Sequence, residues 1–139
     1  MAMADVRLGH ELGTQQRTAP GREQIDAFMV AANFTEPMFT DVGFARAIGY
    51  RDTIVPGPLL AALLEQFLHT ELPGWELERL STTFRVATIA GDTLTFTGVV
   101  TEHHETPSGH RLVCDLVIGH SDAEQAVIST ATLRRAGGA

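Results

Sequence analysis

The fold of this chain depends on one stretch, Val55-Pro-Gly-Pro-Leu-Leu-Ala-Ala-Leu-Leu-Glu-Gln-Phe-Leu68. Pro58 suits the first turn of a helix, where its missing N–H is not needed, and the six residues that follow it are all apolar. A helix on a protein surface has one apolar stripe, so a helix this apolar is expected to have protein on every side. It is too short to cross a bilayer, which takes about 20 such residues. We therefore predict a central helix over residues 57–69.

The sequence after this helix changes to the pattern of β-strands. A turn is expected at Leu72-Pro-Gly74, and apolar residues then recur in four strand-like segments, 76–89, 93–103, 110–119 and 126–134. Short turns between successive strands imply antiparallel pairing, and a sheet with one buried face needs a cover. The central helix is the only adequate cover. The predicted fold class is therefore α+β, with a curved antiparallel sheet wrapped around a central apolar helix.

The residues before the central helix are less regular. Residues 5–17 are polar and weakly alternating, which favours an edge strand or an arm. Apolar residues at three- and four-residue spacing predict a helix from Thr18 to about Asn33. A loop should follow, and Asp41 should cap a short helix over residues 42–48.

Composition limits the classes of function. The 139 residues are 44% hydrophobic and 19% charged, which is typical of one globular domain, here residues 1–139. Lysine and arginine total 10 against 17 acidic residues, a net charge of −7, and the basic residues are scattered, so no nucleic acid partner is expected. Residues 1–5 have neither a cationic stretch nor an apolar core, which predicts a cytoplasmic protein with no membrane partner. The single cysteine, Cys114, falls in an apolar strand and is expected to be a core residue.

Three blocks of sequence together form a family-like pattern. They are Pro37-Met-Phe-Thr-Asp41 with Ala45 and Gly49-Tyr50, then Val55-Pro-Gly-Pro-Leu-Leu-Ala-Ala-Leu63, then Phe84-Arg85 with Gly91-Asp92-Thr-Leu-Thr-Phe-Thr-Gly98. This pattern resembles the MaoC-like dehydratases and (R)-specific enoyl-CoA hydratases, and the resemblance extends over most of residues 25–135. It implies a single MaoC-like domain with a hot-dog fold. It also implies an acyl-thioester substrate carried on coenzyme A or on the phosphopantetheine of a carrier protein, with no further cofactor.

The resemblance further implies a mechanism and a dimer whose two sheets join. In this family an Asp and a His on the loop before the central helix exchange protons with water and carbon, a task that suits groups with pKa values near neutrality. The backbone N–H of Gly57 would polarise the thioester carbonyl, helped by the positive end of the helix. Arg85 is placed to meet either a coenzyme A phosphate or solvent, and the sequence leaves both open.

The chain departs from the family pattern at the catalytic positions. Phe39 occupies the position of the His, and the position of the Asp falls on Phe34, or on Asn33 if the loop is one residue longer. Pro56 replaces the His that precedes the helix glycine. A phenylalanine cannot transfer a proton, so we predict a partner subunit of a heteromeric 3-hydroxyacyl dehydratase. With Pro56 and Gly57, the two phenylalanines would then line the acyl site, although simple core packing is an equally good expectation for them.

Two other functions remain open on the residues. The chain fits a hot-dog acyl-CoA thioesterase in which Glu65, separated by six residues from the segment Pro56-Gly-Pro58, acts as a buried carboxylate with a raised pKa. The alternative for Glu65 is a solvated position near the helix end. The chain also fits a non-catalytic protein that binds an acyl thioester.

A hydratase with displaced catalytic groups is the last possibility. Asn33 would orient water with Asp41 close by, unless Asp41 only caps its helix, and histidines would approach from the strands. The candidate histidines are His103, His104, His110 and His120. His103 and His104 are expected at a solvated strand end, and no metal site is predicted there because adjacent strand residues point to opposite faces.

Overall fold

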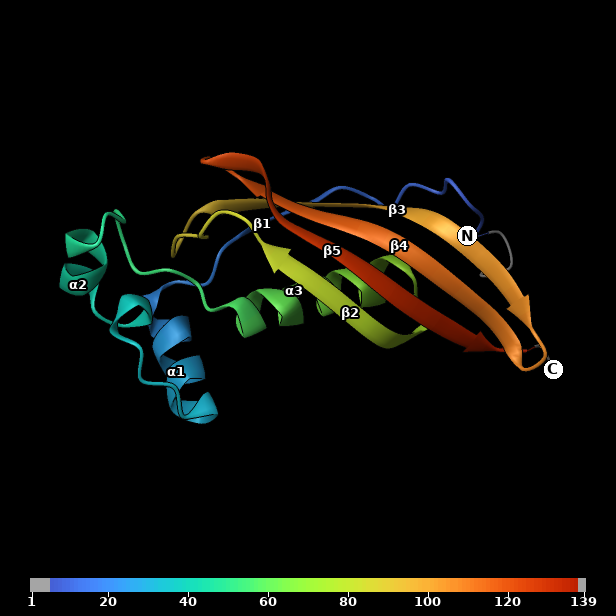
Figure 1. Ribbon diagram of the computed structural model, residues 1–139, viewed down its shortest axis with the longest axis horizontal. Helices are drawn as coiled ribbons and strands as arrows, with labels where there is room; N and C mark the ends of the chain where they lie inside the picture. Colours follow the sequence, from blue (N-terminus) through green and yellow to red (C-terminus); the bar gives the residue numbers. More distant parts are fainter. Residues whose placement is uncertain (1–5, 138–139) are drawn as a thin grey trace.

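The computed structural model describes residues 6–137, so residues 1–5, on which the expected lack of an export signal rests, lie outside it. Within the described residues, five strands form one antiparallel sheet that curves over a long helix, and two shorter helices lie beyond one end of the sheet (Figure 1). The elements in chain order are β1 (Gln15–Thr18), α1 (Arg22–Ala32), the 3-10 turn η2 (Pro37–Phe39), α2 (Val42–Ala47), α3 (Gly57–Glu71), β2 (Glu76–Phe84), β3 (Thr93–Thr106), β4 (Gly109–His120) and β5 (Ala123–Ala136).

The sheet has the strand order β1-β3-β4-β5-β2, and every neighbouring pair is antiparallel. β3, β4 and β5 form two successive hairpins, which confirms the short turns expected between them. β2, the strand that follows α3, lies at one edge beside β5, and β1 lies at the other edge beside β3. The predicted α+β arrangement, an antiparallel sheet over a central helix, is therefore confirmed.

One face of α3 packs against the sheet (Figure 1). Its buried residues are Leu60, Leu63, Leu64, Phe67 and Leu68. The ring of Phe67 lies 5.7 Å from that of Phe96 on β3, measured between centroids. A fully buried Leu or Phe side chain contributes about 1.5–3 kcal/mol relative to an exposed one, so this contact supplies much of the stability of the fold.

The opposite face of α3 is exposed, so the prediction of protein on every side is wrong for this chain. The exposed positions on this face include Pro58, Ala62, Glu65, Gln66 and His69. They recur at the three- to four-residue spacing of a single helical face. The apolar run at the start of the helix hid this stripe, because Pro58 and Ala62 are apolar and still face solvent.

β2 ends at Phe84, whereas the sequence predicted one strand over residues 76–89. The chain leaves the sheet at this point, where the N–H groups of Arg85 and Val86 both donate to the Ala126 carbonyl, at 2.8 and 3.2 Å. The next residues pair with the segment before α3 instead of with β5. The local alternation of apolar residues carries no sign of this long-range pairing.

The remaining expectations hold with small shifts in the element bounds. Gln15–Thr18 forms an edge strand that overlaps the end of the predicted arm 5–17 and the start of the helix predicted from Thr18, and α1 begins at Arg22. The Oδ1 atom of Asp41 accepts a hydrogen bond from the Phe44 N–H at 3.1 Å, which confirms the predicted helix cap. Cys114 is fully buried on β4, and burial raises the pKa of its thiol to about 12, which confirms its place in the core. None of the helices in the described part of the chain has the length and apolar character needed to cross a membrane.

Candidate functional site

A cleft opens at the N-terminal end of α3, between the segment that leads into this helix and the segment that follows β2. Its volume is about 400 Å³. It is lined by Tyr50, Ile54, Val55, Gly57, Leu60, Phe84, Arg85, Val86, Ala87 and Thr88. Pro56 is buried directly before the helix. The cleft therefore includes Gly57 and Arg85 of the predicted binding residues, with Pro56 next to them.

Backbone hydrogen bonds hold the two cleft segments together. The N–H of Val55 donates to the Thr88 carbonyl at 2.8 Å, and the N–H of Ala90 donates to the Thr53 carbonyl at 2.9 Å. An isolated antiparallel bridge lies between these two contacts. The walls of the cleft are thus fixed by main-chain pairing, although neither segment belongs to a helix or to one of the five strands.

Gly57 begins α3 and faces the ring of Phe84. A Cβ atom on Gly57 would lie 2.9 Å from Cζ of Phe84, closer than real side-chain atoms approach. In the first turn of α3, Pro58 has no N–H and the N–H groups of Leu59 and Leu60 donate to the Pro56 carbonyl at 3.1 and 3.2 Å. This leaves the N–H of Gly57 at the end that the helix dipole makes electropositive. The absence of a side chain at Gly57 therefore lets an aromatic ring lie directly against an electropositive helix end.

The cleft has few polar residues. Its described lining includes Tyr50, Arg85 and Thr88, but no residue with a carboxylate or an imidazole. Thr88 is 2% exposed, and its Oγ1 atom has no hydrogen-bond partner in the described part of the chain. Such a lining can hold an apolar chain with a polar head, and among the described residues it offers neither a carboxylate nor an imidazole.

Asn33 and Asp41 lie outside this cleft. Asn33 ends α1 in the left-handed backbone conformation, with φ 57° and ψ 40°, and its side chain is exposed. Asp41 is also exposed and caps α2. The structure thus gives both residues positions at helix ends and does not bring them to the start of α3. Their catalytic assignment stays a prediction.

Phe34 and Phe39 do not line the cleft either. Phe34 is 40% exposed, and its ring packs edge-on against Phe28 with 6.2 Å between centroids. Phe39 is half-buried and packs against the main hydrophobic core. Its turn, η2, is held to the cleft wall because the Ile54 N–H donates to the Met38 carbonyl at 3.2 Å. These contacts favour core packing over an acyl channel for Phe39.

Glu65 lies on the exposed face of α3, so the premise of a buried carboxylate is wrong. Its side chain is 52% exposed, and its Oε1 atom lies 3.6 Å from Nε2 of His69, one helical turn further on. Neither residue lines the cleft. The geometry therefore favours the solvated interpretation of Glu65 over the catalytic one.

The histidines on the strands are divided between the two ends of the sheet. His103 and His110 lie near the β3–β4 turn, where Nε2 of one is 3.0 Å from Nδ1 of the other. Trp75 packs edge-on against both rings, so His103 is half-buried and the expectation of a solvated position is wrong. His104 is exposed beside Glu102. His120 ends β4 at the opposite end of the sheet, so these histidines do not meet.

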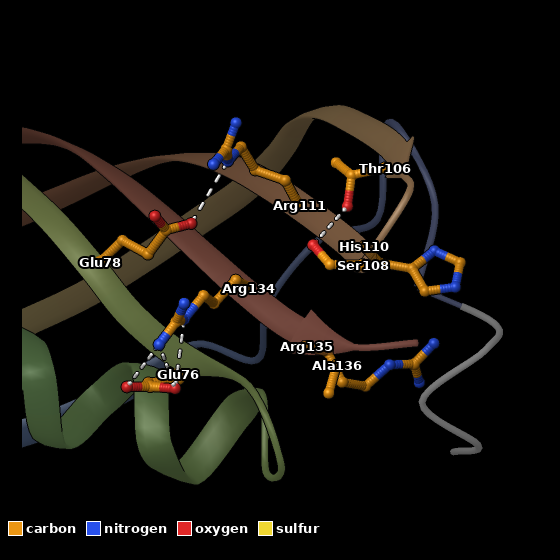
Figure 2. A pocket seen from close by; sticks show the side chains of 9 residues that line it. All are labelled: Glu76, Glu78, Thr106, Ser108, His110, Arg111, Arg134, Arg135 and Ala136. Atoms are coloured by element: carbon orange, nitrogen blue, oxygen red, sulfur yellow. Dashed lines mark hydrogen bonds and ion pairs between the residues drawn. The ribbon is translucent and has the colours of Figure 1, made fainter. Parts of the chain in front are cut away.

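A second and more polar cleft lies beside the β3–β4 turn (Figure 2). In it, Arg111 pairs with Glu78 and Arg134 pairs with Glu76, each at 3.3 Å. Arg135 also lines this cleft, and its guanidinium carbon lies 5.0 Å from the centroid of the Trp75 ring. The charged groups of this cleft are largely engaged within the chain, which makes it the weaker candidate for a ligand site.

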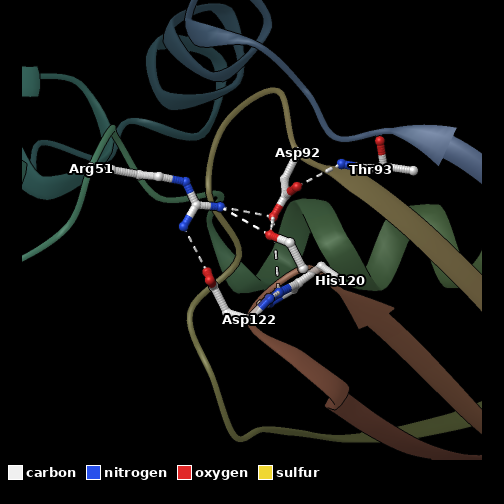
Figure 3. Close-up of polar contacts among 6 residues, drawn as sticks. Arg51, Asp92, Thr93, His120 and Asp122 are labelled. Carbon is white, nitrogen blue, oxygen red and sulfur yellow. Dashed lines mark hydrogen bonds and ion pairs between the residues drawn. The ribbon is translucent and has the colours of Figure 1, made fainter.

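A polar network around Arg51 ties the chain before α3 to two turns of the sheet (Figure 3). The guanidinium lies 3.0 Å from Asp92 and 2.8 Å from Asp122. Burial opposes ionisation of Asp92, but a hydrogen bond from Ser121, a backbone N–H and the charge of Arg51 outweigh it and hold the pKa of Asp92 below its usual value. Asp92, His120 and Asp122 place possible metal-ligand atoms within 4.8 Å of one another. The Arg51 guanidinium already supplies the positive charge between the two carboxylates.

Eight of the ten lining residues were not predicted as binding residues, among them Tyr50, Phe84, Val86 and Thr88. Tyr50 and Phe84 belong to the family-like blocks, so the resemblance contained a signal for them. Thr88 and Val86 lie in a stretch that the sequence assigned to a strand. Their place in the cleft depends on pairing with the segment before α3, and no local pattern reveals that pairing.

A family model described as "FAS1-like, dehydratase domain region" matches residues 7–125. Since this match spans most of the chain, the chain belongs to this family of dehydratase domains, and the predicted MaoC-like relation is confirmed. No curated protein matches the chain.

Several solved structures share the fold. The (R)-hydratase from A. caviae involved in PHA biosynthesis has a TM-score of 0.81 at 22% identity, covering 94% of this chain and 98% of that one. The MaoC-like dehydratase from Rhodospirillum rubrum has a TM-score of 0.83 at 20% identity, covering 100% and 99%. The C-terminally truncated HadBC complex of Mycobacterium tuberculosis, a 3R-hydroxyacyl-ACP dehydratase, has a TM-score of 0.78 at 21% identity, covering 96% and 99%. These likenesses confirm the predicted hot-dog fold.

Proposed function

We propose that this chain is an acyl-thioester-binding subunit of a heteromeric hydratase or dehydratase, in which a second hot-dog subunit supplies the catalytic Asp and His. The observation that carries this proposal is the lining of the cleft at α3. The cleft has largely apolar walls and includes Gly57, the first residue of α3, and its described lining has no carboxylate or imidazole. Membership of the dehydratase-domain family supports the reaction class.

An acyl thioester fits the cleft by size and by chemistry. The volume of about 400 Å³ lies in the range of roughly 300–1,000 Å³ that is usual for small-molecule sites. The acyl chain would lie against Val55, Leu60 and Phe84, with the thioester oxygen at the N–H of Gly57. The exposed Arg85 would meet a phosphate of coenzyme A or of phosphopantetheine. The proposal needs no cofactor beyond this carrier.

The edge strand β2 supports the proposed partner. β2 pairs with β5 on one side, and a sheet edge offers main-chain groups to a strand of another subunit. Phe84, the last residue of β2, and Val86, two residues further on, line the cleft and are 47% and 38% exposed. A second sheet joined here would cover these side chains and would bring its own residues near the cleft.

A heterodimer is the proposed assembly, with a homodimer as the alternative. The HadBC dehydratase is described as a complex, which supports pairing between hot-dog subunits. A substrate linked to coenzyme A or to a carrier protein is a metabolite of the cell interior, which supports a cytoplasmic location for the chain.

Calorimetric titration with crotonyl-CoA and butyryl-CoA tests the proposal. The isolated chain should bind both ligands. Val86→Trp should weaken both affinities at least tenfold, because the added ring would fill the cleft. Val30→Trp, on an 82% exposed position of α1, is the matched control and should bind as the wild type does. A folded wild-type chain that binds neither ligand, or equal affinity in Val86→Trp, would contradict the proposal.

A further inference from the structure

The hydroxyl of Thr88 is buried in the wall of the cleft without a use in the fold. Thr88 is 2% exposed, its backbone carbonyl accepts the Val55 N–H, and its Oγ1 atom has no partner among the described residues. Buried polar groups in proteins nearly always have hydrogen-bond partners, because an unpaired one costs the full desolvation of the group. This hydroxyl therefore calls for a partner that is not part of the described chain.

Two other buried hydroxyls of the chain behave differently. Ser129 is 7% exposed, and its hydroxyl donates to the Ser81 carbonyl at 2.8 Å and lies 3.0 Å from that of Thr82. The hydroxyl of Thr53, which is fully buried, lies 3.4 Å from a carboxylate oxygen of Asp52. Both of these buried hydroxyls therefore have a hydrogen-bond partner within the chain, unlike that of Thr88.

The lining of the cleft that includes Thr88 is largely apolar. It also includes Ile54, Val55, Leu60 and Val86, whose side chains have neither a donor nor an acceptor. Two other buried polar atoms, Trp75 Nε1 and His120 Nε2, also have no partner within residues 6–137, but they do not line this cleft. A valine at position 88 would have nearly the same shape and would make this part of the wall fully apolar. The threonine therefore differs from an apolar residue only by its hydroxyl.

We propose that Thr88 determines specificity, in that its hydroxyl forms a hydrogen bond with a hydroxyl group on the acyl chain of the bound thioester. A hydroxyl both donates and accepts, so it can pair with another hydroxyl in either direction. A saturated acyl chain would leave the Thr88 hydroxyl unpaired, and a site with an unpaired polar group discriminates against such a ligand. This inference rests on the proposed function, because it assumes that the cleft holds an acyl thioester.

Access to the hydroxyl requires a small movement in the wall. The Oγ1 atom is covered in the ligand-free chain. An entering acyl chain would have to displace part of the wall, and Phe84, which lines the same cleft, is 47% exposed. The ring rests against Gly57, which has no side chain to hold it.

Binding of (R)-3-hydroxybutyryl-CoA and butyryl-CoA to three variants tests the inference. The wild type should prefer the hydroxylated ligand about tenfold, which is the usual effect of one hydrogen bond in a buried site. Thr88→Val should lose this preference, because its affinity for the hydroxylated ligand falls while its affinity for butyryl-CoA does not. Thr88→Ser should keep the preference. Thr83→Val, at an exposed position on β2, is the matched control and should bind as the wild type does.

Thermal unfolding of the ligand-free chains separates a binding role from a structural one. Thr88→Val should unfold at a temperature no lower than the wild type, because it removes an unpaired buried hydroxyl. A lower unfolding temperature with unchanged ligand preference would show a structural partner, such as a buried water, and would overturn the inference. Equal affinity of the wild type for both ligands would overturn it as well and leave the proposed function standing. Failure of the folded wild type to bind either ligand would overturn the proposed function and this inference together.

Discussion

Two regions around α3 differ in how fully their side chains are buried and paired. One is the contact between α3 and the sheet, and the other is the cleft at the start of this helix. In the contact, Leu64, Phe67 and Phe96 are fully buried and belong to one continuous hydrophobic core. In the cleft, Phe84 is 47% exposed and the hydroxyl of Thr88 has no partner among the described residues. The contact is finished within one chain, whereas the cleft presents groups that a ligand or a second subunit can use. Substitutions in the contact should therefore change stability, and substitutions in the cleft should change binding.

The largest effect is expected from Leu64→Ala in the contact. Leu64 is 0% exposed, and truncation of such a side chain leaves a cavity that costs about 2–5 kcal/mol of unfolding free energy. Urea denaturation would measure the loss. Leu8→Ala, at a 70% exposed position, should stay within about 0.5 kcal/mol of the wild type. A loss below about 1 kcal/mol in Leu64→Ala would show that this helix face is not the core.

A tenfold loss of affinity with little loss of stability is expected from Gly57→Ala in the cleft. The new methyl group would meet the Phe84 ring at 2.9 Å and push it across the cleft, while alanine suits the helix itself. Butyryl-CoA titration and urea denaturation of the same sample would measure both quantities. Gly21→Ala is the control, because a Cβ atom there meets nothing within 4 Å. Unchanged affinity in Gly57→Ala would place the ligand elsewhere.

A smaller, pH-dependent effect is expected from Asp52→Asn, next to the segment that enters the cleft. The hydrogen bond from Arg22 lowers the pKa of Asp52 from 3.8 to about 2. A carboxyl with a depressed pKa contributes stability above its unfolded pKa and loses that contribution as the pH falls through its folded value. The wild type should therefore lose more unfolding free energy than Asp52→Asn between about pH 4 and pH 2.

Denaturation at several pH values would measure the Asp52 effect. Asp26→Asn, at an exposed position on α1, is the control and should follow the wild-type curve. Parallel curves for the wild type and Asp52→Asn would contradict the role of the Arg22 pair.

No effect on thioester chemistry is expected from Glu65→Gln. Its side chain is 52% exposed and does not line the cleft, so hydrolysis of butyryl-CoA should match that of Glu71→Gln and of the wild type. Release of free thiol would report the hydrolysis. Activity that is present in Glu71→Gln and lost in Glu65→Gln would establish the thioesterase that the helix spacing suggested.

Hydrophobic patterning predicted the parts of the fold that depend on local sequence. The apolar run after Pro58 gave the helix, and the turns between later apolar segments gave antiparallel hairpins. The exposed stripe of α3 was missed because alanine and proline occupy part of it. The end of β2 was missed because Val86 continues an apolar alternation even though the chain has already left the sheet.

The candidate site was predictable only where it coincides with the start of the helix. Gly57 and Arg85, which belong to the family-like blocks, line the cleft, and their binding roles stay predictions. Asn33 and Asp41 instead occupy helix ends. Thr88 was beyond sequence reasoning, because a threonine reveals neither its burial nor the lack of a partner for its hydroxyl until the long-range pairing with Val55 is known.

Hydration of crotonyl-CoA by the isolated chain, at a concentration that saturates the cleft, tests the central claim most directly. We predict that the isolated chain binds crotonyl-CoA but does not hydrate it faster than buffer does. Turnover should begin only after the addition of a hot-dog subunit that has the family's Asp and His. Multiple turnovers by the isolated chain would contradict this prediction, because they would mean that the chain catalyses the reaction without an Asp or a His in the described lining of the cleft.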